Sequence, residues 1–110
     1  MTLKFKASPR VPVRLLDAAG MPVLGILVAS IAGGQAWITR ADGATVAEPL
    51  VDGVNWFEID PANSPGLYHM IFSAAIVSVP ESLGSIQWVV SPTAAQFITF
   101  VGNGSVSRFV

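Results

Sequence analysis

Turn-forming residues interrupt this chain so often that a long regular element hardly fits between them. Glycine, proline, and Asp-Gly or Asn-Gly pairs recur about every 8 to 12 residues, and they separate short runs rich in β-branched and aromatic residues. We find no convincing run with the repeat of apolar positions that marks an amphipathic helix. The pattern therefore predicts an all-β protein, a sandwich of roughly seven to nine short antiparallel strands.

Two apolar segments near the N-terminus are expected to form strands. Val11–Leu16 is rich in β-formers, and Pro12 favours an edge position because proline cannot donate a backbone hydrogen bond. Asp17–Gly20 supplies the turn chemistry that follows it. Val23–Ile31 is apolar on both faces, which favours a central strand, although a buried helix segment would show the same pattern.

Two short pairs are expected to form hairpin turns, Asp42-Gly43 and Asn103-Gly104, because these residue types accept the positive φ angles that such turns need. The segment 75–79 either continues the strand before it past a bulge or forms a strand of its own. The strands expected along the rest of the chain are 35–40, 44–49, 54–59, 67–73, 85–90, 95–101 and 105–110.

The chain is short and carries little charge. With 110 residues it holds one hydrophobic core, so residues 11–110 are expected to form a single β-sandwich domain, and residues 1–10 an N-terminal arm or a first edge strand. Charged side chains make up 12% of the chain, about half of the usual share in soluble domains. Such a surface suits burial against neighbouring chains better than a solitary monomer.

Composition also argues against membrane and nucleic-acid partners. Ala18–Thr39 and Ser82–Ser107 carry no charge, but glycine and proline break both, so no transmembrane helix is expected. No signal peptide is expected, because Ser8-Pro9-Arg10 follows where an apolar core should continue. The basic residues are scattered and the net charge is −1, which gives no concentrated basic face for nucleic acid.

Side chains suited to catalysis or metal binding are few. The chain has no cysteine, and its single histidine, His69, is expected to be an outward-facing or satisfied structural residue. Glu58 and Asp60 alternate onto one side of a strand, with Asp52 nearby, which is compatible with a glycosidase pair or a calcium site. Turn chemistry explains the aspartates better. We therefore predict no enzyme activity, no metal site and no cofactor.

The candidate contact residues fall into two groups. Each of the three tryptophans stands in an expected strand, where it belongs to the core, to an interface or to a flat platform for sugar rings. The segment 97–101 is expected to be an edge strand without protective lysines, which another chain could complete. The candidate residues are Trp37, Trp56 and Trp88 for the first group, and Phe97, Ile98, Phe100 and Val101 for the second.

Four segments follow one another in a recognisable order: Leu15-Leu-Asp-Ala-Ala-Gly-Met-Pro-Val-Leu-Gly25, Asp42-Gly43, Trp56-Phe-Glu-Ile-Asp60 and Ser64-Pro-Gly-Leu-Tyr68. In this order they resemble the small β-sandwich modules of bacteriophage structural proteins, which are similar to Ig-like and prealbumin-like repeats. The resemblance covers Val11 to Phe72. It implies an Ig-like or prealbumin-like Greek-key sandwich and a place in the virion.

The leading hypothesis is therefore a non-enzymatic structural virion protein, either a capsid decoration or cement protein or an adaptor in the neck, tail or baseplate. Its expected partners are other virion proteins and copies of itself. The alternative is a carbohydrate-binding module that recognises host-surface glycans through the tryptophans.

Overall fold

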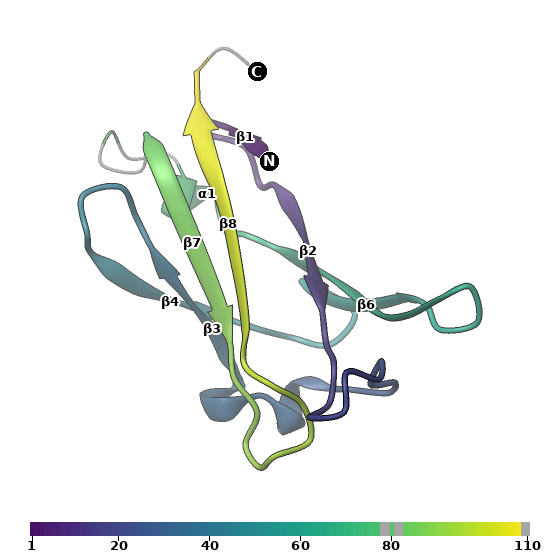
Figure 1. Ribbon diagram of the computed structural model, residues 1–110. Helices are drawn as coiled ribbons and strands as arrows, with labels where there is room; N and C mark the ends of the chain where they lie inside the picture. Colours follow the sequence, from purple (N-terminus) through teal and green to yellow (C-terminus); the bar gives the residue numbers. More distant parts are fainter. Residues whose placement is uncertain (78–79, 81–82, 109–110) are drawn as a thin grey trace.

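The computed structural model describes residues 1–77, 80 and 83–108, and these residues form two packed β-sheets (Figure 1). The predicted all-β sandwich is thus confirmed. Two 3-10 turns, η1 (Val28–Ser30) and η2 (Ala32–Gly34), and one helical turn, α1 (Ala74–Val77), lie between strands. The strands are β1 (Thr2–Lys4), β2 (Arg10–Arg14), β3 (Gln35–Thr39), β4 (Thr45–Pro49), β5 (Trp56–Asp60), β6 (Ser64–Ile71), β7 (Gly84–Val90) and β8 (Phe100–Ser107).

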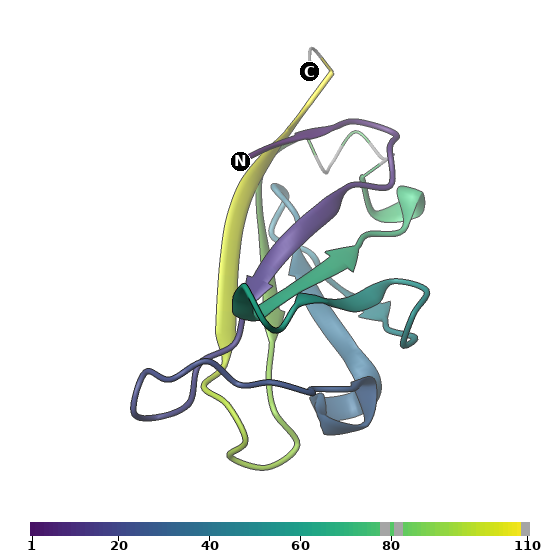
Figure 2. The same cartoon turned by 90° about the vertical axis from the view of Figure 1, so that its right-hand side faces the viewer.

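The strand order is that of an Ig-like sandwich. Sheet A has the order β1-β8-β7-β3-β4 and sheet B the order β2-β6-β5, and Figure 2 shows both layers from the side. In Ig-like domains strands B, E and D share one sheet, while G, F, C and C′ share the other. The strands β2, β6 and β5 match the first set and β8, β7, β3 and β4 the second. One pairing departs from the antiparallel expectation, since β1 runs parallel to β8.

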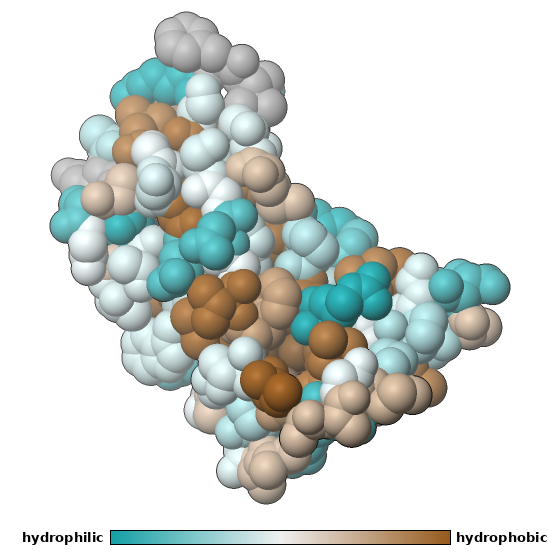
Figure 3. Space-filling model, in the orientation of Figure 1, coloured by the Kyte–Doolittle hydropathy of each residue, from teal (hydrophilic) through white to brown (hydrophobic). Residues whose placement is uncertain are grey.

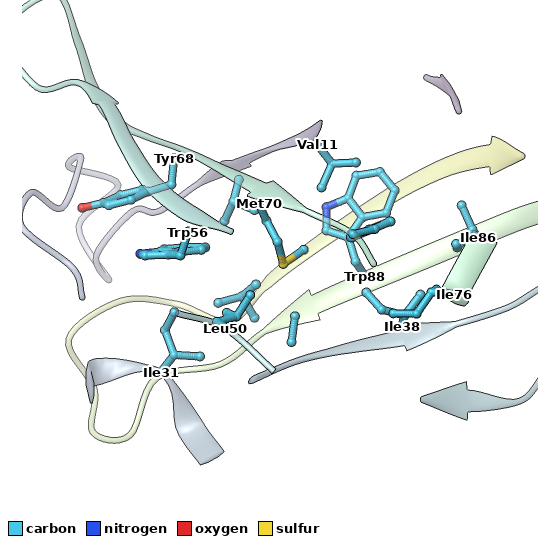
Figure 4. Close-up of a cluster of buried hydrophobic side chains, with 14 of the residues drawn as sticks. Val11, Ile31, Ile38, Leu50, Trp56, Tyr68, Met70, Ile76, Ile86 and Trp88 are labelled. Atoms are coloured by element: carbon cyan, nitrogen blue, oxygen red, sulfur yellow. The ribbon is translucent and has the colours of Figure 1, made fainter. Parts of the chain in front are cut away.

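The hydrophobic core lies between the sheets and takes alternate residues from each strand (Figure 4). On β2, Val11 and Val13 are fully buried while the residues between and beside them are exposed. Tyr68 and Met70 of β6 point inward in the same way. This alternation is what the sequence predicts for a strand with one face against the core.

Several local predictions agree with the structure. Pro12 lies in β2, an edge strand of sheet B, as its missing N–H indicates. Asp42-Gly43 turns the hairpin between β3 and β4, and Gly43 has a φ of 88°. At the N-terminus, residues 2–4 form an edge strand of sheet A, with the side chain of Leu3 buried.

The segment Val23–Ile31 is not the central strand that its apolar pattern predicts. It is an irregular connection that ends in η1. Side chains from sheet B satisfy its backbone: the Tyr68 hydroxyl accepts a hydrogen bond from the N–H of Ile26 at 3.0 Å and donates to the C=O of Val23 at 2.8 Å. The indole N–H of Trp56 donates to the C=O of Ile26 at 2.9 Å. These groups therefore do not need a neighbouring strand.

The predicted hairpin at Asn103-Gly104 is also wrong, because both residues lie inside the continuous strand β8. Gly104 and Gly102 lie against the indole of Trp88, and a Cβ at Gly102 would come within 2.3 Å of that ring. The glycines therefore provide room for a tryptophan. Residues 91–99 make the connection from β7 to β8 instead.

Three of the predicted segments in the last third of the chain differ from what the structure shows. Of the predicted strand 95–101, only the last two residues belong to β8. Residues 105–107 complete the same strand, and 109–110 lie outside the described residues. In the segment 75–79, residues 75–77 belong to α1, so they do not continue β6, and 78–79 lie outside the described residues.

Candidate functional site

The three tryptophans have different environments. Trp56 and Trp88 are each 2% exposed and belong to the core, whereas Trp37 is 44% exposed on the outer face of sheet A. Trp56 stacks on Tyr68 with ring centroids 5.0 Å apart, and Trp88 meets Phe72 edge-on at 5.5 Å. A platform of three tryptophans is therefore absent, and Trp37 is the one of the three with a largely exposed ring.

The outer face of sheet A is nearly free of charge. Strand register places Trp37 beside Ala47 on one side and Val89 on the other, and Val89 beside Val101. These four residues form a row across β4, β3, β7 and β8, which we call the apolar row. Lys4 is the one charged residue among those that β1, β8, β7, β3 and β4 turn outward.

A second row of four residues, the polar row, runs beside the first. Register aligns Thr45 with Thr39, Thr39 with Gln87, and Gln87 with Asn103. The Gln87 amide donates to the Asn103 side-chain oxygen at 3.4 Å. Hydroxyl and amide groups here can exchange hydrogen bonds with a partner without the cost of burying a charge.

The residues of the predicted edge strand 97–101 separate in the structure. Phe97 is buried in the core. Phe100, the first residue of β8, is partly buried and packs against that core. Ile98 and Val101 are 55% and 47% exposed. Both line a shallow groove of about 200 Å³, together with Arg14, Leu16, Thr99 and Phe100. Figure 3 shows hydrophobic surface gathered over this lower part of β8.

The acidic residues of the suggested glycosidase pair do not come together as the sequence suggested. Glu58 and Asp52 line one hollow of about 210 Å³ with Trp56, but Asp60 is not part of its lining. Asp60 accepts hydrogen bonds from the backbone and side chain of Asn63, which lower its pKa. The turn chemistry that the sequence indicates for Asp60 is what the structure shows.

Glu58 and Asp52 each hold a backbone group of the irregular connection. Glu58 accepts the N–H of Gly25 at 3.0 Å, and Asp52 accepts the N–H of Val28 at 2.9 Å. Glu58 also lies 3.3 Å from the Tyr68 hydroxyl. Burial, with the negative charge of Glu58 as a smaller cause, raises the pKa of Tyr68 to about 12. The hydroxyl therefore keeps its proton and can donate to the backbone at neutral pH.

His69 lies on the outer face of sheet B, in register with Pro12 on one side and Phe57 on the other. Burial, and then the charge of Arg10, lower its pKa. Its Nδ1 atom is buried and has no hydrogen-bond partner in the described part of the chain. The histidine thus faces outward as predicted, and within that part of the chain its ring is not fully satisfied.

Glu48 is a buried acidic residue, and the sequence does not reveal its burial. It belongs to the edge strand β4, points inward with 4% of its surface exposed, and accepts a hydrogen bond from the N–H of Ser73. Burial raises its pKa, and the bond from Ser73 opposes this in part. An inward-pointing charge on an edge strand discourages further strands from pairing there.

Replacing Glu48 by glutamine is expected to stabilise the protein above neutral pH relative to the unmodified chain. Because its pKa is raised on folding, the folded state binds the proton more tightly, so stability falls as pH rises through that raised pKa. Glutamine cannot ionise and can still accept from Ser73. Urea unfolding of both proteins from about pH 4 to pH 8 should show curves that diverge as pH rises. Parallel curves would contradict this account.

Within residues 1–77, 80 and 83–108, no helix is long and apolar enough to cross a membrane. The same residues contain no cluster of histidine and acidic side chains that could hold a metal ion. Among known proteins, no family model, no curated protein and no solved structure matches this chain.

Proposed function

We propose that this chain is a non-enzymatic structural module that works by packing the outer face of sheet A against other protein chains. The apolar row carries the proposal. It crosses four strands of a face on which Lys4 is the one charged residue, whereas solvent-facing sheets usually alternate core residues with polar and charged ones. Trp37, at 44% exposure, lies within the row, and tryptophan is enriched among the residues that dominate protein interfaces.

The bacteriophage virion is the proposed setting. Support comes from the resemblance of residues 11–72 to small β-sandwich modules of phage structural proteins and from the low charge of the chain. In a virion the module would serve as a capsid decoration or cement protein, or as an adaptor in the neck, tail or baseplate. Each of these roles needs surfaces that stay buried against neighbours.

Replacing Trp37 by glutamate is expected to weaken binding to virion partners by about a hundredfold or more, because it removes a large apolar contact and buries a charge. The fold should remain, since Trp37 faces outward. Light scattering of the chain mixed with candidate capsid and tail proteins measures the association. Ile59→Glu is the matched control, because Ile59 is 39% exposed on the other sheet. Equal binding by the Trp37 variant and the unmodified chain would refute the proposal.

The same face supports a second candidate function, recognition of a neutral glycan. A hollow of about 260 Å³ at the polar row is lined by Thr39, Gln87 and Asn103, together with Arg40, which forms an ion pair with Asp42 at 3.7 Å. Trp37 precedes Thr39 by two residues on the same face of β3. Stacking on an aromatic ring combined with amide hydrogen bonds suits a sugar. Gln87→Ala separates the functions: it should strongly reduce signals on a glycan array, whereas protein association, which the apolar row dominates, should weaken far less than in Trp37→Glu.

A further inference from the structure

The edge of β8 is covered over only part of its length. Thr2–Lys4 of β1 pairs with Ser105–Ser107, whereas Phe100–Gly104 has β7 on one side and, in the described part of the chain, no strand on the other. Figures 1 and 2 show β1 beside the far end of β8 only. A stretch of sheet edge thus remains open next to β1.

The backbone groups along this open edge can be assigned from Ser105. Its N–H donates to the C=O of Met1 at 2.9 Å, so it points away from β7. Backbone direction repeats every two residues in a strand, so Val101 and Asn103 point their N–H and C=O groups the same way. Two donors and two acceptors therefore face outward, and no strand in the described part of the chain lies beside them.

The open edge of β2, in sheet B, is protected against such pairing. The N–H of Leu15 donates to Gly66 beside β6, so the alternate position Pro12 faces the open side, where it has no N–H to offer. Arg10 and Arg14 flank it with positive charge and are exposed. Proline and charged side chains are common means of blocking edge-to-edge pairing.

The remaining edges are protected in other ways. On β4, Glu48 points inward and Pro49 ends the strand. On β5, a bulge between Glu58 and Asp60 interrupts the register. The stretch Val101–Gly104 of β8 has only valine, glycine and asparagine, without proline, charge or bulge. Among the edges of the described strands longer than three residues, it is therefore the one that lacks these protections.

We infer that this edge of β8 pairs with the same edge of a second copy of the chain, antiparallel about a two-fold axis at Gly102. Val101 of each copy then exchanges two hydrogen bonds with Asn103 of the other, four bonds in all. Gly102 faces Trp88 within its own chain, so no side chain obstructs the axis. The inference rests on the proposed packing function and names one of its partners.

A second copy is the occupant that these residues favour. The outward groups are self-complementary about Gly102, and the paired stretch itself carries no charge that would repel its own copy. Beside it, the groove lined by Ile98, Leu16 and Val101 offers apolar surface that the second copy can cover. Arg14 also lines this groove, and its guanidinium donates a hydrogen bond to the C=O of Pro65 at 3.4 Å. Such a contact is small, so we expect a weak dimer that high local concentration in an assembly would favour.

Cross-linking tests the register directly, because the chain has no cysteine of its own. In the inferred dimer, positions 101 and 103 of opposite copies form hydrogen-bonded pairs with Cα atoms about 5.5 Å apart, a separation that disulfides adopt. Val101→Cys combined with Asn103→Cys should give a covalent dimer under mild oxidation. Val101→Cys alone is the control, since its copies lie diagonally at roughly 7–8 Å and should cross-link far less.

Asn103→Pro supplies an independent test, because it removes one outward N–H at an edge, where proline is tolerated. Light scattering should show at least tenfold weaker dimerisation, while Asn103→Ser and Trp37→Glu dimerise normally. Circular dichroism checks that each variant is folded. A chain that stays monomeric at every concentration, and whose double-cysteine variant does not cross-link, overturns the inference.

Two other outcomes would refute self-pairing through β8 without refuting the proposed packing function. A dimer that survives Asn103→Pro but is lost in Trp37→Glu would assign self-association to the outer face of sheet A. Hydrogen-exchange protection of the Val101 and Asn103 amides only in a mixture with another virion protein would assign the edge to a strand from that protein. Either result leaves the packing proposal standing.

Discussion

Replacing Gly102 by alanine is expected to lower the free energy of unfolding by about 3 kcal/mol, at the upper end of the usual cost of overfilling a core. The added methyl group would come within 2.3 Å of two indole atoms of Trp88. The ring cannot move away easily, because it is 2% exposed and packs edge-on against Phe72. Urea denaturation followed by tryptophan fluorescence measures the change.

Ser105→Ala is the matched control for Gly102→Ala. It lies on β8 as well, but its side chain points outward, and its backbone bond to Met1 is kept. We expect a change within about 0.5 kcal/mol. If Gly102→Ala lowered the free energy of unfolding as little as Ser105→Ala does, the close contact described between β8 and Trp88 would be refuted.

Sequence reasoning succeeds where a residue's local chemistry decides the outcome. Asp42-Gly43 forms its hairpin because the turn needs a positive φ, which Gly43 adopts. Pro12 is at an edge because a missing N–H can be tolerated only there. The inward side of β6 follows from simple alternation of its residues. Each of these predictions depends on backbone geometry within a few residues.

It fails where the deciding contact comes from a distant part of the chain. The glycine in Asn103-Gly104 reads as a turn signal, but the reason for Gly102 and Gly104 is the Trp88 ring on the neighbouring strand. Exposure of the tryptophans is also undetermined, since Trp37 and Trp88 both stand in strands and only the sheet arrangement turns one outward and the other inward. Glu48 likewise gives no sign in the sequence that it is buried.

The irregular connection over Val23–Ile31 shows the same limit most clearly. Its composition suits a buried strand, but its bonding groups are taken by Trp56 and Tyr68 from sheet B and by two carboxylates. These partners are 24 to 45 residues away in the chain. Short-range sequence patterns contain no information about these distant partners. The hydroxyl of Tyr68 is the most direct place to test the arrangement, because it bonds two backbone groups of the connection.

Tyr68→Phe is expected to lower the free energy of unfolding by about 2 to 4 kcal/mol, although it removes a single oxygen atom. The hydroxyl accepts from the N–H of Ile26 and donates to the C=O of Val23, and the first of these bonds is buried. Loss of the hydroxyl leaves both backbone groups without that hydrogen-bond partner. Each buried group left unpaired costs about 1 to 3 kcal/mol of stability. Core volume is nearly unchanged, so the effect reports on the hydrogen bonds.

Hydrogen exchange gives the result a local signature that a general loss of stability would not. The amide of Ile26 should exchange much faster in Tyr68→Phe than the global loss of stability explains, while amides in the centre of β7 should speed up only in proportion to that global loss. Thr45→Val is the matched control, because it removes an exposed hydroxyl that bonds Thr39 at 3.1 Å, and we expect less than about 0.5 kcal/mol. If Ile26 kept its protection, the connection would depend on Trp56 and the carboxylates, and Tyr68 would serve only as core.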